Sequence, residues 1–90
     1  MEAKIRFPDN PGKALAVCMK KLRAKKGMTQ GDIVRATGLE RSYVSSLEAG
    51  KIKHPRMHTF NKIAMAFGMK LSELIIYCEK IHSKFSPSSS

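Results

Sequence analysis

The segment Gln30–Gly50, QGDIVRATGLERSYVSSLEAG, decides how the rest of this chain folds. It contains two short runs whose spacing lets a pair of helices touch where they cross. The residues at those contact positions are Ile33, Thr37, Leu39, Val44 and Leu47. Gly38 lies between the two runs and supplies the left-handed backbone conformation that a sharp turn requires. The segment therefore predicts a helix-turn-helix.

Capping residues set the limits of these two helices. Thr29 is a suitable N-cap for the first helix, and Asp32 three residues later completes a capping-box pattern that also complements the helix dipole. The second helix is expected to begin near Glu40 or Arg41 and to stop at Gly50. The polar residues on the faces that Val44 and Leu47 do not occupy are Arg41, Ser42, Ser45 and Ser46. These faces are where base-reading side chains are expected.

Three further helices are predicted around this motif. Asn10 followed by Pro11 is typical of a helix start, and the apolar spacing after it predicts a helix to about Lys26. A second stripe of apolar residues predicts a helix from Met57 that Gly68 ends. A third predicts a helix over residues 71–83.

Three connected segments resemble the Xre family, the fold of lambdoid phage repressors and Cro: MTQGDIVRATG, LERSYVSSLEAGK and HPRMHTFNKIAMAFGMKLSEL. The resemblance extends from about Leu15 to Leu74. It implies an all-α, five-helix lambda-repressor-like domain that binds operator DNA, usually as a dimer. We therefore expect an N-terminal arm at residues 1–10, the helix-turn-helix domain at 11–84 and a disordered tail at 85–90.

The composition favours a polyanionic partner. Seventeen Lys and Arg residues against seven Asp and Glu give a formal charge of +10, which points to double-stranded DNA. A membrane is not expected, because no apolar run approaches the length of a spanning helix and the basic residues are not confined to one amphipathic helix. The chain carries no signal peptide pattern, so we expect a cytoplasmic, nucleoid-associated protein.

Catalytic and metal-binding patterns are missing from the sequence. There is no glycine-rich phosphate loop, no HExxH and no serine in a strained elbow, so we expect neither an enzyme nor a cofactor or small-molecule ligand. Cys18 and Cys78 fall at apolar helical positions without a CxxC pair, which predicts reduced thiols in the core. The three histidines have no ligand spacing, so no metal site is expected.

The expected DNA interface separates residues that read bases from residues that bind phosphate. The expected base readers are Arg41, Ser42, Tyr43 and Ser46. Arg41 should dominate, because arginine can donate to guanine O6 and N7 together, whereas Tyr43 is equally suited to bracing the helix. The expected phosphate contacts are Thr29, Gln30, Lys51, Lys53 and Arg56. The first two lie at a helix N-terminus and the others in a basic loop.

The resemblance implies one structural ion pair, and the sequence differs from the family pattern at two positions. It implies an ion pair between Arg23 and Glu48 that ties the first helix to the end of the recognition helix. Glu40 stands where the family usually has a serine or threonine cap, and Val34 stands where it prefers alanine. These departures affect the start of the recognition helix and the angle between the two helices of the motif.

A homodimer contact is expected from Ile76 and Ile81 of the last helix and from Phe85 just beyond it. The leading hypothesis is a sequence-specific DNA-binding transcriptional regulator that reads operator DNA with the helix near residues 41–49. An alternative is an antitoxin or other protein-interaction module with the same fold. A third hypothesis is an RNA or non-specific nucleic-acid binder.

Overall fold

The structure, a computed structural model, describes residues 10–85, and every regular element among them is an α-helix. The helices are α1 (Pro11–Lys26), α2 (Gln30–Thr37), α3 (Arg41–Glu48), α4 (Met57–Ala66) and α5 (Leu71–Phe85). The expected all-α, five-helix fold is confirmed. The last helix continues past Ser83 to Phe85. Apart from Asn10 and Phe85, the arm expected at 1–10 and the tail expected at 85–90 lie outside the described residues.

The first two helices begin at their expected caps. Asn10 accepts a hydrogen bond from the Lys13 N–H at 3.0 Å, and Pro11 follows at the first helical position, where no N–H is needed. At the start of α2 the Thr29 hydroxyl accepts from the Asp32 N–H at 3.0 Å, and the Asp32 carboxylate accepts from the Thr29 N–H at 2.8 Å. The hydrogen bond from the Thr29 N–H holds the pKa of Asp32 below its ordinary value, because it stabilises the charged carboxylate.

The side chain of Thr37 closes the turn between α2 and α3. Its buried hydroxyl donates to the carbonyl of Ile33 at 2.7 Å and accepts from the Leu39 N–H at 3.1 Å. Gly38 has a φ of 75°, the left-handed conformation expected at this position. Glu40 precedes α3 in an extended conformation and makes no side-chain capping hydrogen bond. The first N–H groups of α3 are therefore not satisfied by the side chain of its N-cap residue.

A core of apolar and sulfur-containing side chains joins the helices. Its largest fully buried members are Leu15, Cys18, Met19, Ile33, Val44, Leu47, Ile63, Leu74 and Cys78. The two cysteines are free thiols, as predicted, and the Sγ of Cys18 donates to the Sγ of Cys78 across 3.3 Å. This hydrogen bond and the burial both raise the pKa of the Cys18 thiol, so Cys18 stays protonated at neutral pH.

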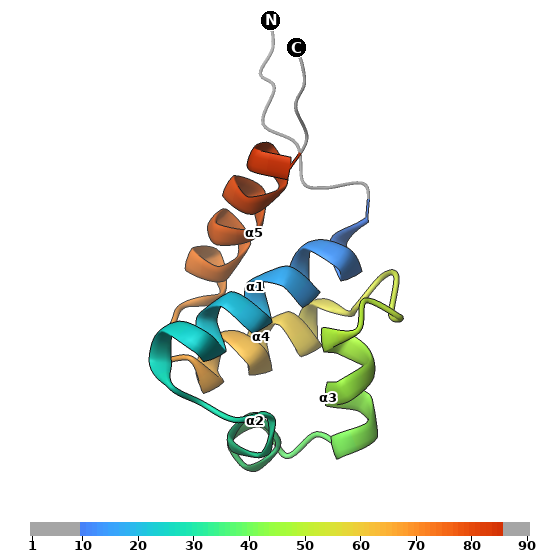
Figure 1. Cartoon of the computed structure of the whole chain (residues 1–90), viewed down its shortest axis with the longest axis vertical. Helices are drawn as coiled ribbons and strands as arrows, with labels where there is room; N and C mark the ends of the chain where they lie inside the picture. The colour runs from blue at the N-terminus through green and yellow to red at the C-terminus, as the bar shows by residue number, and fades with distance from the viewer. Residues whose placement is uncertain (1–9, 86–90) are drawn as a thin grey trace, which may run out of the picture.

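The two helices of the motif lie together at one end of the bundle, and α5 lies toward the other end (Figure 1). α4 packs against α2 and α5, while α1 packs against α3 and α5. From α4, the Lys62 ammonium donates to the carbonyl of Thr37 at 3.2 Å, and Thr59 shares a hydroxyl hydrogen bond of 3.3 Å with Tyr43 of α3. α4 therefore fixes the positions of both helices of the motif.

Candidate nucleic-acid interface

Helix α3 has one face in the core and one face open to solvent. The buried residues are Val44, Leu47 and Glu48. Among the expected base readers, Arg41 and Ser42 are exposed and Ser46 is half-buried. The open face thus presents a guanidinium and hydroxyl groups, which are able to donate to the acceptor groups on base edges in a major groove.

Tyr43, the fourth expected base reader, is held by the protein itself. Its ring is half-buried against the core, and its hydroxyl is engaged by Thr59 of α4 at 3.3 Å. Reading a base with this side chain would require breaking that hydrogen bond. The geometry therefore favours the bracing role for Tyr43.

The N-terminus of α2 offers backbone donors rather than the expected side chains. The Thr29 hydroxyl is occupied by the capping box, and the Gln30 amide donates to the Glu48 carboxylate at 3.2 Å. The backbone N–H groups of Gln30 and Gly31 have no acceptor among residues 10–85, as is usual in a first helical turn. A phosphate at this position would therefore meet main-chain N–H groups.

A buried carboxylate joins three helices behind the interface. Glu48 accepts from Arg23 Nε at 2.6 Å and from Arg23 Nη2 at 2.9 Å, so the ion pair that the resemblance implied is present and two-pronged. Hydrogen bonding to Glu48 raises the pKa of Arg23. Arg23 also donates to the carbonyl of Met28 at 3.1 Å. With the Gln30 contact, this cluster ties α1 and the start of α2 to the end of α3.

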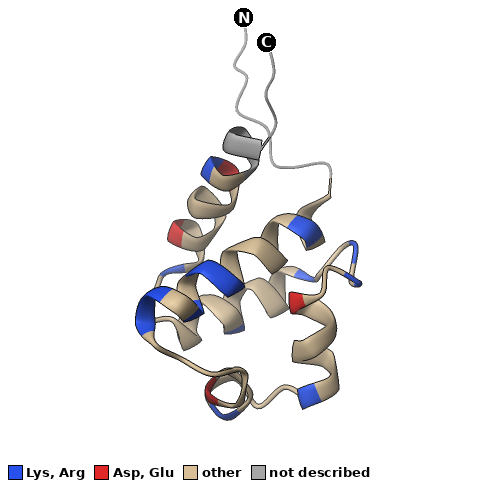
Figure 2. Ribbon diagram, in the orientation of Figure 1, with Lys and Arg blue, Asp and Glu red and all other residues tan. Residues whose placement is uncertain are grey.

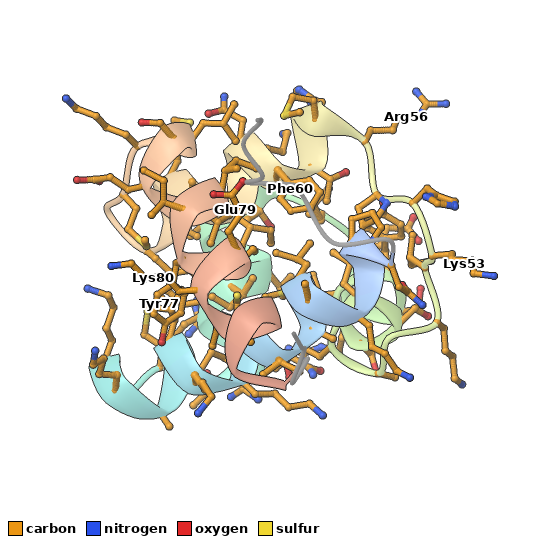
Figure 3. All side chains as sticks on the ribbon, turned by 90° about the horizontal axis from the view of Figure 1, so that it is seen from above. Lys53, Arg56, Phe60, Tyr77, Glu79 and Lys80 are labelled. Carbon is orange, nitrogen blue, oxygen red and sulfur yellow. The ribbon has the colours of Figure 1, made fainter. Side chains whose placement is uncertain are left out.

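The basic loop, residues 49–56 between α3 and α4, carries the remaining expected phosphate contacts. Lys51, Lys53 and Arg56 are exposed, and none of the three forms an ion pair within the part of the chain that the structure describes. Lys53 and Arg56 point away from the helices (Figure 3). Basic residues occupy the start of α3, this loop and α1 (Figure 2). The loop thus presents three cations to a polyanion.

The structure adds Arg35, which was not among the residues expected from the sequence. Its guanidinium pairs with Asp32, and its Nη1 lies 3.5 Å from the point where a Cβ on Gly31 would lie. Arg41 Nη2 lies 3.3 Å from the same point. Two guanidinium groups therefore approach the first turn of α2. The sequence could have indicated this position, because Gly31 and Arg35 are four residues apart on one helix and therefore lie on the same side of it.

The three residues expected at a dimer contact have different environments. Ile76 is 50% exposed on α5, whereas Ile81 is 5% exposed and belongs to the core. Ile81 follows Leu74 and Cys78 at helical spacing, so it faces inward and does not supply dimer surface, which corrects the expectation for that residue. The side chain of Phe85 lies outside the described residues.

The described residues offer no metal site and no membrane-spanning helix. Within residues 10–85, no group of three or more His, Cys, Asp or Glu side chains is arranged to hold a metal ion. His54 and His58 are exposed. Among the described helices, none has both the length and the apolar character needed to cross a membrane.

A five-helix bundle with an open polar face on the second helix of the motif and a basic loop beside it defines a helix-turn-helix DNA-binding protein. The chain belongs to the family of Cro/C1-type HTH DNA-binding domains, whose pattern it matches over residues 19–80. The predicted Xre resemblance is thereby confirmed.

Similar proteins agree with this family. A protein of Sinorhizobium fredii named as an uncharacterized HTH-type transcriptional regulator is 36% identical over 55 residues, covering 61% of this chain and 70% of its own length. One of Archaeoglobus fulgidus with the same description is 34% identical over 59 residues, covering 66% and 83%. These comparisons support a DNA-binding regulator and do not favour an antitoxin.

A third similar protein is an enzyme, and the similarity covers little of it. The match is 28% identical over 64 residues and covers 71% of this chain, but only 6% of a glutamine–fructose-6-phosphate aminotransferase of Methanocaldococcus jannaschii. The chain thus corresponds to a small part of that enzyme. No solved structure matches the chain significantly.

Proposed function

We propose that this chain is a sequence-specific transcription regulator that acts on the nucleoid in the cytoplasm and reads operator DNA as a homodimer, without a chemical step. The proposal rests on the difference between the two faces of α3. Arg41 and Ser42 are exposed at its start, while its opposite face is buried against the core. A helix held in this way can enter a major groove without being reshaped.

The residues have separate roles in this proposal. Arg41 reads a guanine through O6 and N7, and Ser42 and Ser46 make weaker contacts with neighbouring base edges. The backbone N–H groups in the first turn of α2 bind a phosphate. The basic loop supplies the other phosphate contacts through Lys51, Lys53 and Arg56.

Dimerisation rests on the exposed Ile76 of α5 and on the two half-sites that such proteins usually read. The recognition helices of the two protomers would then lie roughly 34 Å apart, one turn of DNA. Sedimentation of the free protein and of its complex with a full-length site measures the stoichiometry. A monomer in both samples would rule out the dimer.

The experiment begins with selection of bound sites from a random duplex library, followed by Arg41→Ala and Lys53→Ala on the selected site. We expect Arg41→Ala to weaken binding to the selected site by about 1–3 kcal/mol and to relax preference at one base pair in each half-site. Lys53→Ala should weaken selected and scrambled duplexes equally and lower the salt slope by about one unit for each phosphate that the protein no longer neutralises.

The controls are the melting temperatures of both variants and the salt dependence of the parent protein. With roughly six phosphate contacts in a dimer, the log–log slope of affinity against salt should be about −5. An affinity that does not change between low and physiological salt would contradict DNA as the partner. If Arg41→Ala weakens every duplex equally, Arg41 binds phosphate and the reading falls to the serines.

A further inference from the structure

The first turn of α1 makes direct contact with the basic loop. The backbone N–H of Gly12 donates to the carbonyl of Lys53 at 2.9 Å. The first N–H groups of a helix have no partner within the helix. Here Pro11 has no N–H, and that of Lys13 is taken by the Asn10 side chain. The loop carbonyl therefore satisfies the one donor in this turn that the local cap leaves free.

This contact requires a glycine because of space, not of backbone conformation. A Cβ on Gly12 would lie 1.7 Å from the Ile52 carbonyl oxygen and 2.9 Å from that of Lys53. Both neighbours are backbone atoms, which cannot rotate away as the end of a side chain can. Any other residue at position 12 must separate the loop from α1.

The loop is also fixed on both sides of this contact. The Lys51 N–H donates to the Ser46 carbonyl of α3 at 3.0 Å, and the Arg56 carbonyl accepts from the Phe60 N–H of α4 at 3.1 Å. Between these ends, the contact with Gly12 holds the carbonyls of the loop inward. The side chain of Lys53 then projects outward, as Figure 3 shows.

We infer that Gly12, which lies outside the helix-turn-helix, is a positioning residue for phosphate binding by the basic loop. The inference rests on the proposed DNA-binding function. Gly12 itself touches no DNA in this scheme. It acts by keeping the loop cations at the spacing that the DNA backbone requires, so that their charges are presented without an ordering step on binding.

Gly12→Ala tests the inference, with Ser72→Ala as a matched control. Gly12 is the second residue of α1, and Ser72 is the second residue of α5. The Ser72 side chain is exposed, and it lies outside the helix-turn-helix and the basic loop. Both substitutions introduce alanine at the same position of a helix, but only Gly12→Ala displaces the loop.

We expect Gly12→Ala to weaken selected and scrambled duplexes alike, by roughly tenfold at physiological salt, and to reduce the salt slope. Ser72→Ala should leave the slope at the parent value. A purely structural role for Gly12 would lower the melting temperature without changing the slope of the folded protein. A folded Gly12→Ala protein with the parent slope overturns the inference.

Amide exchange of the unaltered protein keeps the test decisive if Gly12→Ala does not fold. The Gly12 N–H exchanges when its hydrogen bond to the Lys53 carbonyl opens and the loop is displaced. If the displaced form binds DNA roughly tenfold more weakly, duplex binding should make this opening rarer and slow the exchange by about the same factor. The Met69 N–H, bonded to the Ala64 carbonyl at 2.8 Å, is the reference away from the loop. Equal slowing at Gly12 and Met69, or none at either, overturns the inference.

The two proposals fail in different ways. A parent protein that binds no duplex at low salt contradicts the proposed function. A parent protein that binds DNA normally, while Gly12→Ala and Ser72→Ala share its salt slope, contradicts the role of Gly12 alone.

Discussion

Breaking the ion pair between Arg23 and Glu48 should destabilise the fold far more than breaking a surface pair. The Glu48 side chain is 6% exposed and that of Arg23 is 25% exposed. Among residues 10–85, Arg23→Met would leave the carboxylate with the Gln30 amide as its remaining side-chain donor. Removing one partner of a buried pair costs about 3–5 kcal/mol, against a total stability of roughly 5–15 kcal/mol for a domain.

A loss of about 3 kcal/mol corresponds to a fall in melting temperature of roughly 12–24 °C for a domain of this size. Calorimetry and urea denaturation would measure it. Glu48→Gln should cost less, because the amide oxygen still accepts a hydrogen bond and the more exposed Arg23 can recover water.

Two results would refute this reasoning. A cost below about 1 kcal/mol for Arg23→Met would mean that the pair behaves as an exposed one. The double variant Arg23→Met with Glu48→Leu should recover most of the stability, since an apolar pair of similar volume can replace a buried ion pair. A double variant as unstable as Arg23→Met alone would show that the destabilisation came from packing instead.

Asp32, Gly31 and the two cysteines each give a further prediction. Asp32 has a lowered pKa in the folded protein, so it stabilises the fold above its ordinary value of 3.8 and loses that contribution as pH falls through the lower folded value. Asp32→Asn should flatten the acid side of a melting-temperature profile, and an unchanged profile would count against the capping box. Gly31→Ala should raise stability by about 0.5–1 kcal/mol in calorimetry, and a lower melting temperature would contradict this. Cys18 and Cys78 should react with a thiol reagent only at the rate of unfolding, so rapid labelling in native buffer would disprove their burial.

The helix boundaries could be predicted from the sequence because they depend on local contacts. Thr29 and Asp32 cap a helix through atoms three residues apart, and Gly38 supplies a backbone conformation that few other residues adopt. The buried stripes follow from the helical period in the same way. The C-terminal end of α5 is an exception. The helix was expected to end at Ser83 but continues to Phe85, because no glycine or proline within the helix precedes Phe85 to end it.

The ion pair between Arg23 and Glu48 was implied by the family resemblance. Other side-chain contacts between helices could not be predicted, because they depend on distances that sequence spacing does not encode. Gln30 was expected to bind phosphate, yet the fold brings Glu48 to its amide. The sequence left Tyr43 equally suited to reading a base and to bracing the helix. The structure favours bracing, because the Thr59 hydroxyl of α4 lies beside the Tyr43 hydroxyl. Gly12 has the sequence context of an ordinary second residue of a helix, and its role depends on a loop about forty positions later in the chain.

The division of α3 into a buried and an open face also bears on how such a regulator can evolve. Substitutions at exposed positions away from special contacts usually change stability by no more than about 0.5 kcal/mol. Arg41, Ser42 and Ser45 are exposed, whereas the fold is secured through Val44 and Leu47 on the other face. Under the proposed function, duplicated copies of this gene can therefore acquire new operator preferences one residue at a time, without passing through an unfolded intermediate.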